Sequence, residues 1–245
     1  PSATASSHGP SAALVLDGSA ETAWQSDAAL GREQQIELDL RYEREFGGLI
    51  LRWSPDAFAS KYDVELSLDR KRWRIVRTVT QGNGERDALF LPESEARYVR
   101  IRLHDGPAPH YGLAELEVKD LAFGATPNAF LSALAAEAPR GRYPRAYVGE
   151  QPYWTLVGVD GGSDSGLISE DGAVELGRGK IAVEPFVVEG GGLVSWADVE
   201  LEQSLLDGYL PIPTVRCAVP SGTCGSLLWP PAMKKTLSSG RVTKS

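Results

Sequence analysis

The sequence predicts an all-β protein made of two β-sandwich domains joined by a short helix. Three observations support this fold class. Apolar and polar residues alternate in short runs through residues 35–118, turn residues separate these runs, and a second series of short apolar runs begins near Tyr147. Alternation with a period of two is typical of strands that bury one face.

The length of 245 residues is enough for two domains that each bury a core. The formal net charge is −8, and no cluster of Lys and Arg is dense enough to follow a phosphate backbone. Charge therefore argues against a nucleic acid partner and against an anionic membrane surface. No apolar run has the length of a bilayer-spanning helix.

Seven apolar runs predict the strands of the first domain. They are Ile36/Leu38/Leu40, Leu49/Leu51/Trp53, Val64/Leu66/Leu68, Ile75/Val76/Val79, Ala88/Phe90, Val99/Ile101/Leu103 and Leu116/Val118. Residues 69–72 and 82–84 have the composition of hairpin turns between such strands. Spacing of this kind predicts an all-β sandwich or barrel.

A short helix is predicted in the linker, residues 123–146. Thr126 is a suitable N-cap and Pro127 a suitable first-turn residue, and the apolar residues that follow share one helical face until Pro139. A second β domain, residues 147–223, is predicted from further short runs. These runs are 154–157, 166–168, 173–176, 181–184, 186–188 and 194–196.

The alternation stops at about Cys224. Residues 224–245 are therefore expected to be an unstructured tail or the product of a reading-frame shift near Thr223, and the sequence leaves both alternatives open.

An ordered series of motifs runs from about Ser7 to Lys119. It comprises Asp17-Gly18 with Thr22 and Trp24, then Trp53, then Tyr62-Asp63-Val64 with Ser67, Asp69 and Trp73, then Arg97-Tyr98-Val99-Arg100-Ile101 and Tyr111-Gly112-Leu113-Ala114-Glu115. The series resembles the coagulation-factor type C domain, or discoidin domain, and especially its bacterial carbohydrate-binding branch. The resemblance implies that residues 1–122 form a jelly-roll sandwich that binds an oligosaccharide or polysaccharide.

The second domain resembles the start of the N-terminal β-supersandwich of bacterial six-hairpin glycosidase-like proteins. The motifs that carry this resemblance are Tyr153-Trp154-Thr155-Leu156-Val157-Gly158 and the run 203–213. The resemblance implies an incomplete β-sandwich, and a chain that is the truncated, non-catalytic front of a glycoside hydrolase.

Asp17 and Thr22 lie five residues apart in a loop of small residues. This spacing suits a calcium-binding loop of oxygen ligands, and equally an Asx-type turn in which Thr22 bonds to local backbone. In the family that the chain resembles, a structural cation is commonly held by this loop and by a Glu in the last strand. The resemblance thus implies a calcium site at Asp17, Thr22 and Glu115, with backbone oxygens near Leu14 and Ala20.

Sugar recognition needs an aromatic face and polar groups on loops at one end of a rigid sandwich. The loops 54–60, 81–87 and 104–111 offer such groups. We expect the sugar contacts to be Asp56, Phe58, Arg86, His110 and Tyr111. Phe58 has the alternative role of a plug beneath its loop, and Arg86 that of a solvated charge.

Catalysis by this chain is not expected. Carboxylate pairs such as Glu115/Glu117 lie two apart on one strand, where they share a face without flanking a substrate. The three histidines stand in no nucleophile motif. The expected function is to target a parent glycoside hydrolase to polysaccharide. The protein is expected to be secreted or periplasmic, with the signal segment absent from this chain. The alternative is a discoidin-type adhesion domain that binds protein or phospholipid.

Overall fold

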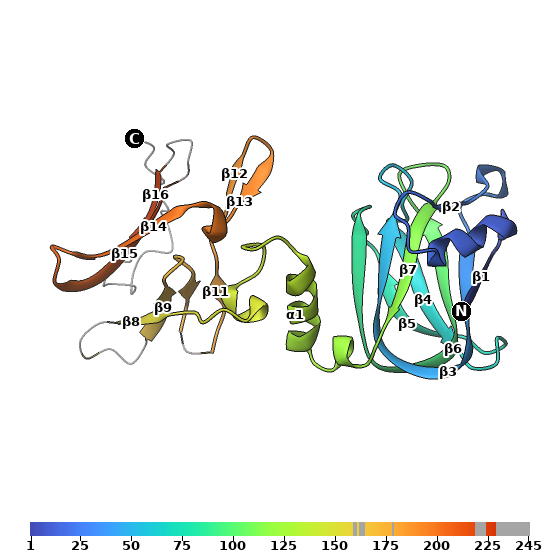
Figure 1. Ribbon diagram of the computed structural model, residues 1–245, viewed down its shortest axis with the longest axis horizontal. Coiled ribbons are helices and arrows are strands. Elements are labelled where there is room, and N and C mark those ends of the chain that lie inside the picture. Colours follow the sequence, from blue (N-terminus) through green and yellow to red (C-terminus); the bar gives the residue numbers. More distant parts are fainter. Residues whose placement is uncertain (159–160, 162–164, 178, 219–223, 229–245) are drawn as a thin grey trace. The chain divides into compact units, whose positions relative to one another are not determined.

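The computed structural model describes residues 1–158, 161, 165–177, 179–218 and 224–228. The chain divides into two compact units, Pro1–Ala133 and Leu134–Ser245 (Figure 1). We call them the first and the second unit and describe each by itself.

The first unit is built on one antiparallel sheet. Its strands are β1 (Ser2–Ala5), β2 (Trp24–Gln25), β3 (Gln34–Trp53), β4 (Lys61–Ser67), β5 (Arg74–Val79), β6 (Arg86–Asp105) and β7 (Gly112–Lys119). Their order is β2-β7-β3-β6-β4-β5, and β1 pairs with β3. Three short 3-10 helices accompany them, η1 (Gly9–Leu16), η2 (Ala28–Leu30) and η3 (Ala122–Gly124).

Strands β3 and β6 each run through both layers of the sandwich, and their bend is visible in Figure 1. The pairing of β3 with β6 shifts register between Asp39 and Arg44, and Arg41 and Glu93 take left-handed φ values of 74° and 51°. Four of the predicted runs therefore merge into two long strands. Irregular pairing at the bend turns the strand without ending it, which the run pattern could not show.

The predicted alternation is confirmed in the core. Ile36, Leu38, Leu49 and Leu51 are completely buried. Trp24 and Tyr62, with relative exposures of 0%, join the same core. Burial of so many apolar side chains is the main source of stability for this unit.

The predicted turn at residues 69–72 is also confirmed. The Asp69 carboxylate accepts hydrogen bonds from the backbone amides of Lys71 and Arg72 at 2.9 and 2.8 Å. These bonds hold the pKa of Asp69 well below its ordinary value. The turn thus closes the hairpin of β4 and β5.

The predicted linker helix is α1 (Pro127–Glu137). The Thr126 hydroxyl accepts a hydrogen bond from the Ala129 amide at 3.0 Å, as expected of an N-cap. The Phe130 ring packs against Phe90 and Phe123, with centroids 5.4 and 5.2 Å apart. This aromatic contact extends the first unit to residue 133, beyond the expected boundary at residue 122. Among the described helices, none combines the length and apolar character needed to cross a bilayer.

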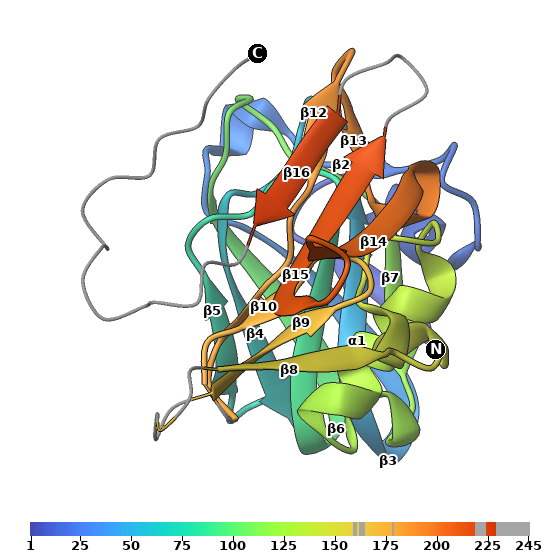
Figure 2. The same ribbon diagram turned by 90° about the vertical axis from the view of Figure 1, so that its left-hand side faces the viewer.

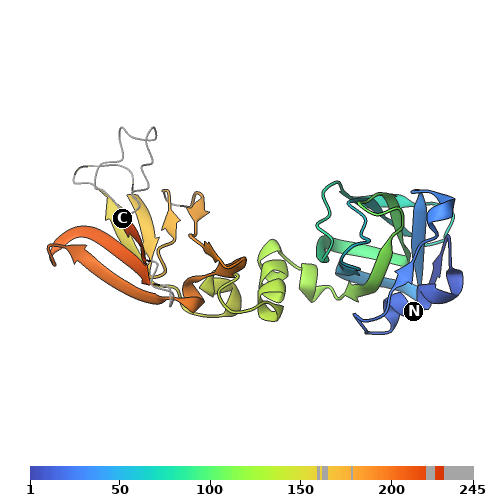
Figure 3. The ribbon, with the colours of Figure 1, turned by 90° about the horizontal axis from the view of Figure 1, so that it is seen from above.

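The described part of the second unit contains three small sheets. Its elements are η4 (Arg145–Val148), β8 (Trp154–Gly158), β9 (Ser165–Ser169), β10 (Val174–Glu175), β11 (Ala182–Val183), β12 (Val187–Glu189), β13 (Gly192–Val194), η5 (Trp196–Asp198), β14 (Glu200–Leu206), β15 (Leu210–Ala218) and β16 (Cys224–Leu228). The sheets are β11-β10-β9-β8, β12-β13 and β14-β15-β16. Figure 2 shows β15 between β14 and β16, and Figure 3 shows the β14–β15 hairpin beside the β8–β9 pair.

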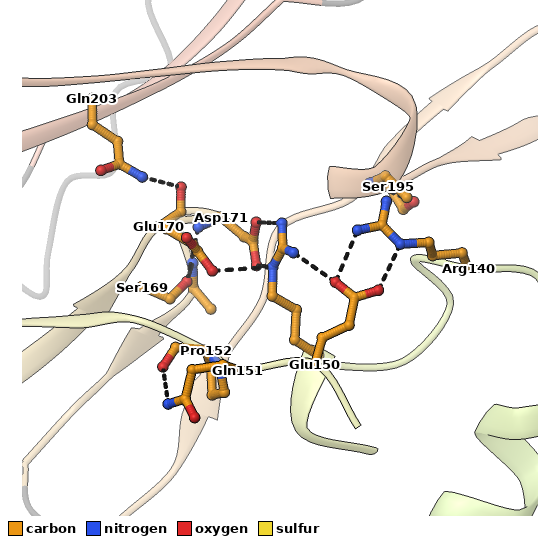
Figure 4. A network of polar contacts seen from close by, with 12 residues as sticks. Arg140, Glu150, Gln151, Pro152, Ser169, Glu170, Asp171, Ser195 and Gln203 are labelled. Atoms are coloured by element: carbon orange, nitrogen blue, oxygen red, sulfur yellow. Dashed lines mark hydrogen bonds and ion pairs between the residues drawn. The ribbon is translucent and has the colours of Figure 1, made fainter. Parts of the chain in front are cut away.

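An ion-pair cluster extends the second unit upstream of the expected boundary at residue 147 (Figure 4). Arg145 bonds the Asp171 carboxylate through two nitrogens at 2.7 and 2.8 Å, and it also bonds Glu150 at 2.7 Å. Arg140 pairs with the same Glu150 at 2.6 and 2.8 Å. Both guanidinium groups lie over the Trp196 ring. Bidentate pairs and ring stacking of this kind fix the linker segment to the sheets.

Part of the expected tail forms a strand. Residues 224–228 form β16, which pairs with β15 from Thr214 to Ala218. The open edge of β15 supplies the backbone partners that the side-chain pattern does not reveal. Thr223 and residues 229–245 lie outside the described residues, so the two alternatives for the tail stay open.

Candidate functional site

Three loops meet at one end of the first unit, and we call this end the three-loop surface. It comprises the loops 54–60, 81–87 and 104–111. The loop 54–60 lies between the other two, because the Gly82 amide donates to the Ser60 carbonyl at 2.9 Å and the Ser60 amide donates to the Asp105 carbonyl at 2.8 Å. These bonds bring the three loops together at one end of the sandwich.

Two glycines allow this close approach. A Cβ atom at Gly84 would overlap the Phe58 ring, and one at Gly106 would overlap the Phe58 carbonyl oxygen. Gly84 also has a φ of +86°, which favours glycine. Phe58 is half-buried and packs against the core. This packing favours the interpretation of Phe58 as a plug, with only part of its ring accessible.

The expectation for Tyr111 is wrong. Its side chain is 1% exposed and belongs to the core, so it offers no aromatic face to a sugar. The reason is the short loop before it, since the Ser26 hydroxyl accepts a hydrogen bond from the Tyr111 amide at 2.8 Å and holds the residue inward. Burial raises the pKa of the Tyr111 hydroxyl.

The other expected contacts are more accessible. Asp56 is exposed in a turn, and His110 is half-buried. Arg86 is half-buried at the start of β6, where it pairs in register with Arg52. The structure brings these three residues to the same end of the sandwich, on loops or at a strand end.

Two residues that organise the three-loop surface were missed in the sequence. The Arg32 guanidinium donates to the Asp105 carboxylate at 3.0 Å and to the Gly106 carbonyl at 2.7 Å, and so anchors the loop 104–111. The Asp87 carboxylate accepts from the indole of Trp53 at 2.9 Å and the hydroxyl of Tyr62 at 2.7 Å. The turn composition after Leu30 could have pointed to Arg32 as a loop residue. No feature of the sequence around Asp87 pointed to its role.

A histidine between two carboxylates lies beside this surface. His104 contacts Asp63 through Nε2 at 2.9 Å and Glu33 through Nδ1 at 3.1 Å. Burial lowers the pKa of His104, but its hydrogen bonds with Asp63 and Glu33 outweigh burial and raise the pKa above the ordinary value.

The expected cation ligands converge on one loop. The Thr22 hydroxyl donates to the Asp17 carboxylate at 2.7 Å, and the Gly18 amide donates to the Glu115 carboxylate at 2.5 Å. The Ser19 amide also donates to Asp17 at 2.9 Å, so the Asx-type turn is present as well. Glu115 thus comes from β7 to the loop that holds Asp17 and Thr22.

The electrostatics of this loop fit a hard cation. Glu115 is only 7% exposed, and burial raises its pKa; the hydrogen bond from Gly18 opposes this rise, and the negative charge of Asp17 adds to it. Two carboxylates that repel each other beside a hydroxyl form the oxygen-rich set that calcium prefers. The described residues hold no cluster of three His, Cys, Asp or Glu side chains that would suit a metal. A cation at this loop would therefore need backbone carbonyls as further ligands.

The Glu115/Glu117 pair has structural partners. Glu117 pairs with Arg52 at 3.3 Å and with Lys119 at 2.9 Å, while Glu115 accepts from the Gly18 amide. Burial raises the pKa of Glu115. Burial would also raise the pKa of Glu117, but its bonds with Lys119 and Arg52 outweigh burial and lower that pKa. Both side chains are thus engaged within the fold.

Comparison with known proteins supports the first resemblance. Residues 2–116 match the family model described as the F5/8 type C domain. A search of curated proteins found no match to this chain.

Similar solved structures cover the same part of the chain. Chitosan-binding module 1 of a chitosanase/glucanase from Paenibacillus sp. IK-5 is 32% identical, with 48% of this chain and 92% of that chain covered and a TM-score of 0.43. Module 2 of that enzyme, in complex with chitotriose, is 26% identical, with 48% and 95% covered and a TM-score of 0.43. The module CpGH89CBM32-5 from Clostridium perfringens, in complex with GalNAc-β-1,3-galactose, is 22% identical, with 48% and 93% covered and a TM-score of 0.45.

Proposed function

Because residues 2–116 belong to the F5/8 type C domain family, we propose that the first unit is a non-catalytic carbohydrate-binding module. The polarity of the three-loop surface carries this proposal. None of the described residues in its three loops is a large apolar side chain that is exposed. A polar surface suits a ligand rich in hydroxyl groups, whereas insertion into a bilayer needs exposed apolar side chains.

The exposed Asp56 and the half-buried His110 would bond sugar hydroxyls, and the accessible part of the Phe58 ring would pack against a C–H face of the sugar. A site with so few groups binds weakly. Its use would be to hold a linked enzyme near a polysaccharide and so raise the local substrate concentration. Such a role places the protein outside the cytoplasm or in the periplasm.

A glycan array with the full chain tests this function, followed by titration with the best sugar. The double variant Asp56→Ala with His110→Ala should lower the affinity by roughly tenfold, because each lost hydrogen bond costs about 0.5–1.5 kcal/mol. The matched control is Glu45→Ala, which removes an exposed carboxylate beside the bend of β3.

Vesicle flotation tests the alternative function, a discoidin-type adhesion domain that binds phospholipid. Binding to phosphatidylserine vesicles together with a blank glycan array would replace the carbohydrate function by phospholipid adhesion.

We also propose that calcium binds at Asp17, Thr22 and Glu115, with backbone oxygens near Leu14 and Ala20. The convergence of Asp17, Thr22 and Glu115 on one loop supports this proposal, since a divalent cation would offset the negative charge of the two carboxylates. Its role would be to hold the loop in place. Calorimetry on chelated protein is the direct test, and absence of calcium binding would reject the site.

For the second unit we propose a place in a larger glycosidase-associated β-sandwich. The support is its small buried cluster of Val157, Ile168 and Val215, against many exposed apolar side chains. Sequencing the gene through and beyond the codon for Thr223 tests this proposal. An open frame beyond this codon, in the present or a shifted frame, that leads into a catalytic domain would support it, and the absence of such a frame would reject it.

A further inference from the structure

A cleft of about 320 Å³ lies between two antiparallel strand pairs of the second unit. Each pair supplies two triplets, residues 153–155 and 168–170 from the β8–β9 pair and residues 203–205 and 213–215 from the β14–β15 pair. The triplets are in register, with Trp154 opposite Ser169 and Ser204 opposite Thr214. The volume is at the lower end of the range of about 300–1,000 Å³ for small-molecule sites.

The cleft has a buried apolar floor. Ile168 and Val215 line it and are both 3% exposed, and together with Val157 they form the buried cluster between the two sheets. The floor therefore belongs to the best-packed part of the second unit. A site on a packed floor needs little ordering when a ligand binds.

An aromatic side chain forms part of the rim. Tyr153 lines the cleft and is 66% exposed. Trp154 precedes Thr155, which lies opposite the floor residue Ile168, so its ring points to the other face of the sheet. Exposed aromatic rings next to a cleft offer the flat apolar faces that pack against the C–H side of a sugar ring. On the three-loop surface, the only such ring is the half-buried Phe58.

Fixed polar groups form the rest of the lining. The Gln203 amide donates to the Glu170 carbonyl at 3.0 Å, as Figure 4 shows, which orients its remaining acceptor oxygen. Gln203 lies opposite the floor residue Val215, so its side chain is on the cleft face of the β14–β15 pair. Hydrogen-bond donors and acceptors held on strands are suited to recognise hydroxyl groups.

The charge of the lining selects a neutral ligand. No lysine or arginine is among the twelve lining residues, which disfavours phosphate or carboxylate ligands. The only carboxylate is that of Glu170, and Arg145 pairs with it at 3.3 Å. A neutral compound with both hydroxyl groups and apolar faces matches this lining.

From these observations we propose that the cleft is a second saccharide site, which takes one ring of a neutral oligosaccharide. The ring packs against Tyr153, and its hydroxyl groups bond Gln203. This site goes beyond the proposed function, because it lies in the other unit and shares no residue with the three-loop surface.

Calorimetric titration of the full chain with cellohexaose, xylohexaose, mannohexaose and chitohexaose tests the site. Tyr153→Ala should weaken binding of the best of these sugars at one class of sites by tenfold or more, and Gln203→Ala by about fivefold. Matched controls are Tyr209→Ala, since Tyr209 is 75% exposed and does not line the cleft, and Gln151→Ala, whose amide bonds only the adjacent Pro152 carbonyl. Both controls should change affinity by less than twofold. Circular dichroism checks that every variant keeps its fold.

The variants distinguish this inference from the function of the first unit. Binding that falls with Tyr153→Ala and Gln203→Ala supports the cleft, whatever the Asp56 and His110 variant does. Binding that falls only with the Asp56 and His110 variant overturns the cleft and leaves the proposed function in place. Binding that falls only with the cleft variants supports the cleft and overturns the proposed function. No binding of any of the four sugars overturns the cleft.

Discussion

The two units bury their apolar residues very differently. In the first unit a single core runs through both layers and includes completely buried side chains such as Leu38 and Ile101. In the described part of the second unit the comparable cluster has three buried members, and twelve large apolar side chains are exposed, among them Leu156 at 70% and Val188 at 72%. The same period-two pattern thus gives a closed core in one unit and open sheets in the other. Alternation predicts strands, but a closed core forms only where a second layer packs on the apolar face of the sheet.

Separating the units should have the largest effect. Expressed alone, residues 1–133 should unfold in one cooperative thermal transition, because this unit contains its whole core. Residues 134–245 alone should unfold at a much lower temperature and over a broader range, because burial of little apolar surface barely offsets chain entropy. Calorimetry measures both. A transition in the second fragment as sharp and at as high a temperature as that of the first would contradict the comparison.

A matched pair of substitutions sharpens the comparison of packing in the two units. Ile101→Ala in the first unit should cost about 2–5 kcal/mol, as is usual when a buried side chain leaves a cavity. Ile168→Ala in the second unit should cost less, about 1–2 kcal/mol, because the open cleft beside it leaves less new cavity surface. Denaturant unfolding of the full chain, followed in each unit, gives both values. Equal costs would show that the second unit is as tightly packed as the first.

Calcium should stabilise only the first unit. At a calcium concentration about 100-fold above Kd the expected gain is about 2.7 kcal/mol, or a rise of roughly 10 °C in Tm. Asp17→Asn should abolish this rise, because it removes one of the two carboxylates at the loop. The control Asp27→Asn changes an Asp that caps η2 at a different loop, and it should keep the rise. A rise that survives Asp17→Asn would place the cation elsewhere.

The smallest effect concerns pH and is again confined to the first unit. The folded pKa of His104 lies above the ordinary value, so the protonated ring stabilises the fold below about pH 6.5, and this stability is lost as the pH rises through the folded pKa. The loss should be under about 1 kcal/mol, since the site is partly exposed. Unfolding free energies of His104→Asn at pH 5.5 and 8.5 should lack this difference. The control His110→Asn, which has no ion pair in the described chain, should retain it.

Much of the first unit could be predicted from the sequence because its signals are local. Alternation predicts which residues face the core, and the motif at residues 69–72 predicts a turn that the backbone amides of Lys71 and Arg72 complete. The spacing of Asp17 and Thr22, together with the family resemblance, predicted that Glu115 would reach the same loop.

What the sequence could not predict depends on contacts between distant residues. Tyr111 was expected on the surface, but Ser26, eighty-five positions away, holds it inward. The Arg32 anchor of the loop 104–111 is a contact of the same kind. The cleft in the second unit was missed because it arises between two hairpins whose residues carry no shared motif.

The passage of β3 and β6 through both layers also has a mechanical consequence. Neither layer can be pulled from the other without breaking the pairing of β3 with β6 along both halves of these strands. Under a stretching force, the first unit should therefore give way in a single step, with no stage in which one layer has opened and the other still holds. A tether with this response stays fully closed up to its yield force, which is what the proposed role of holding a linked enzyme at a polysaccharide would require.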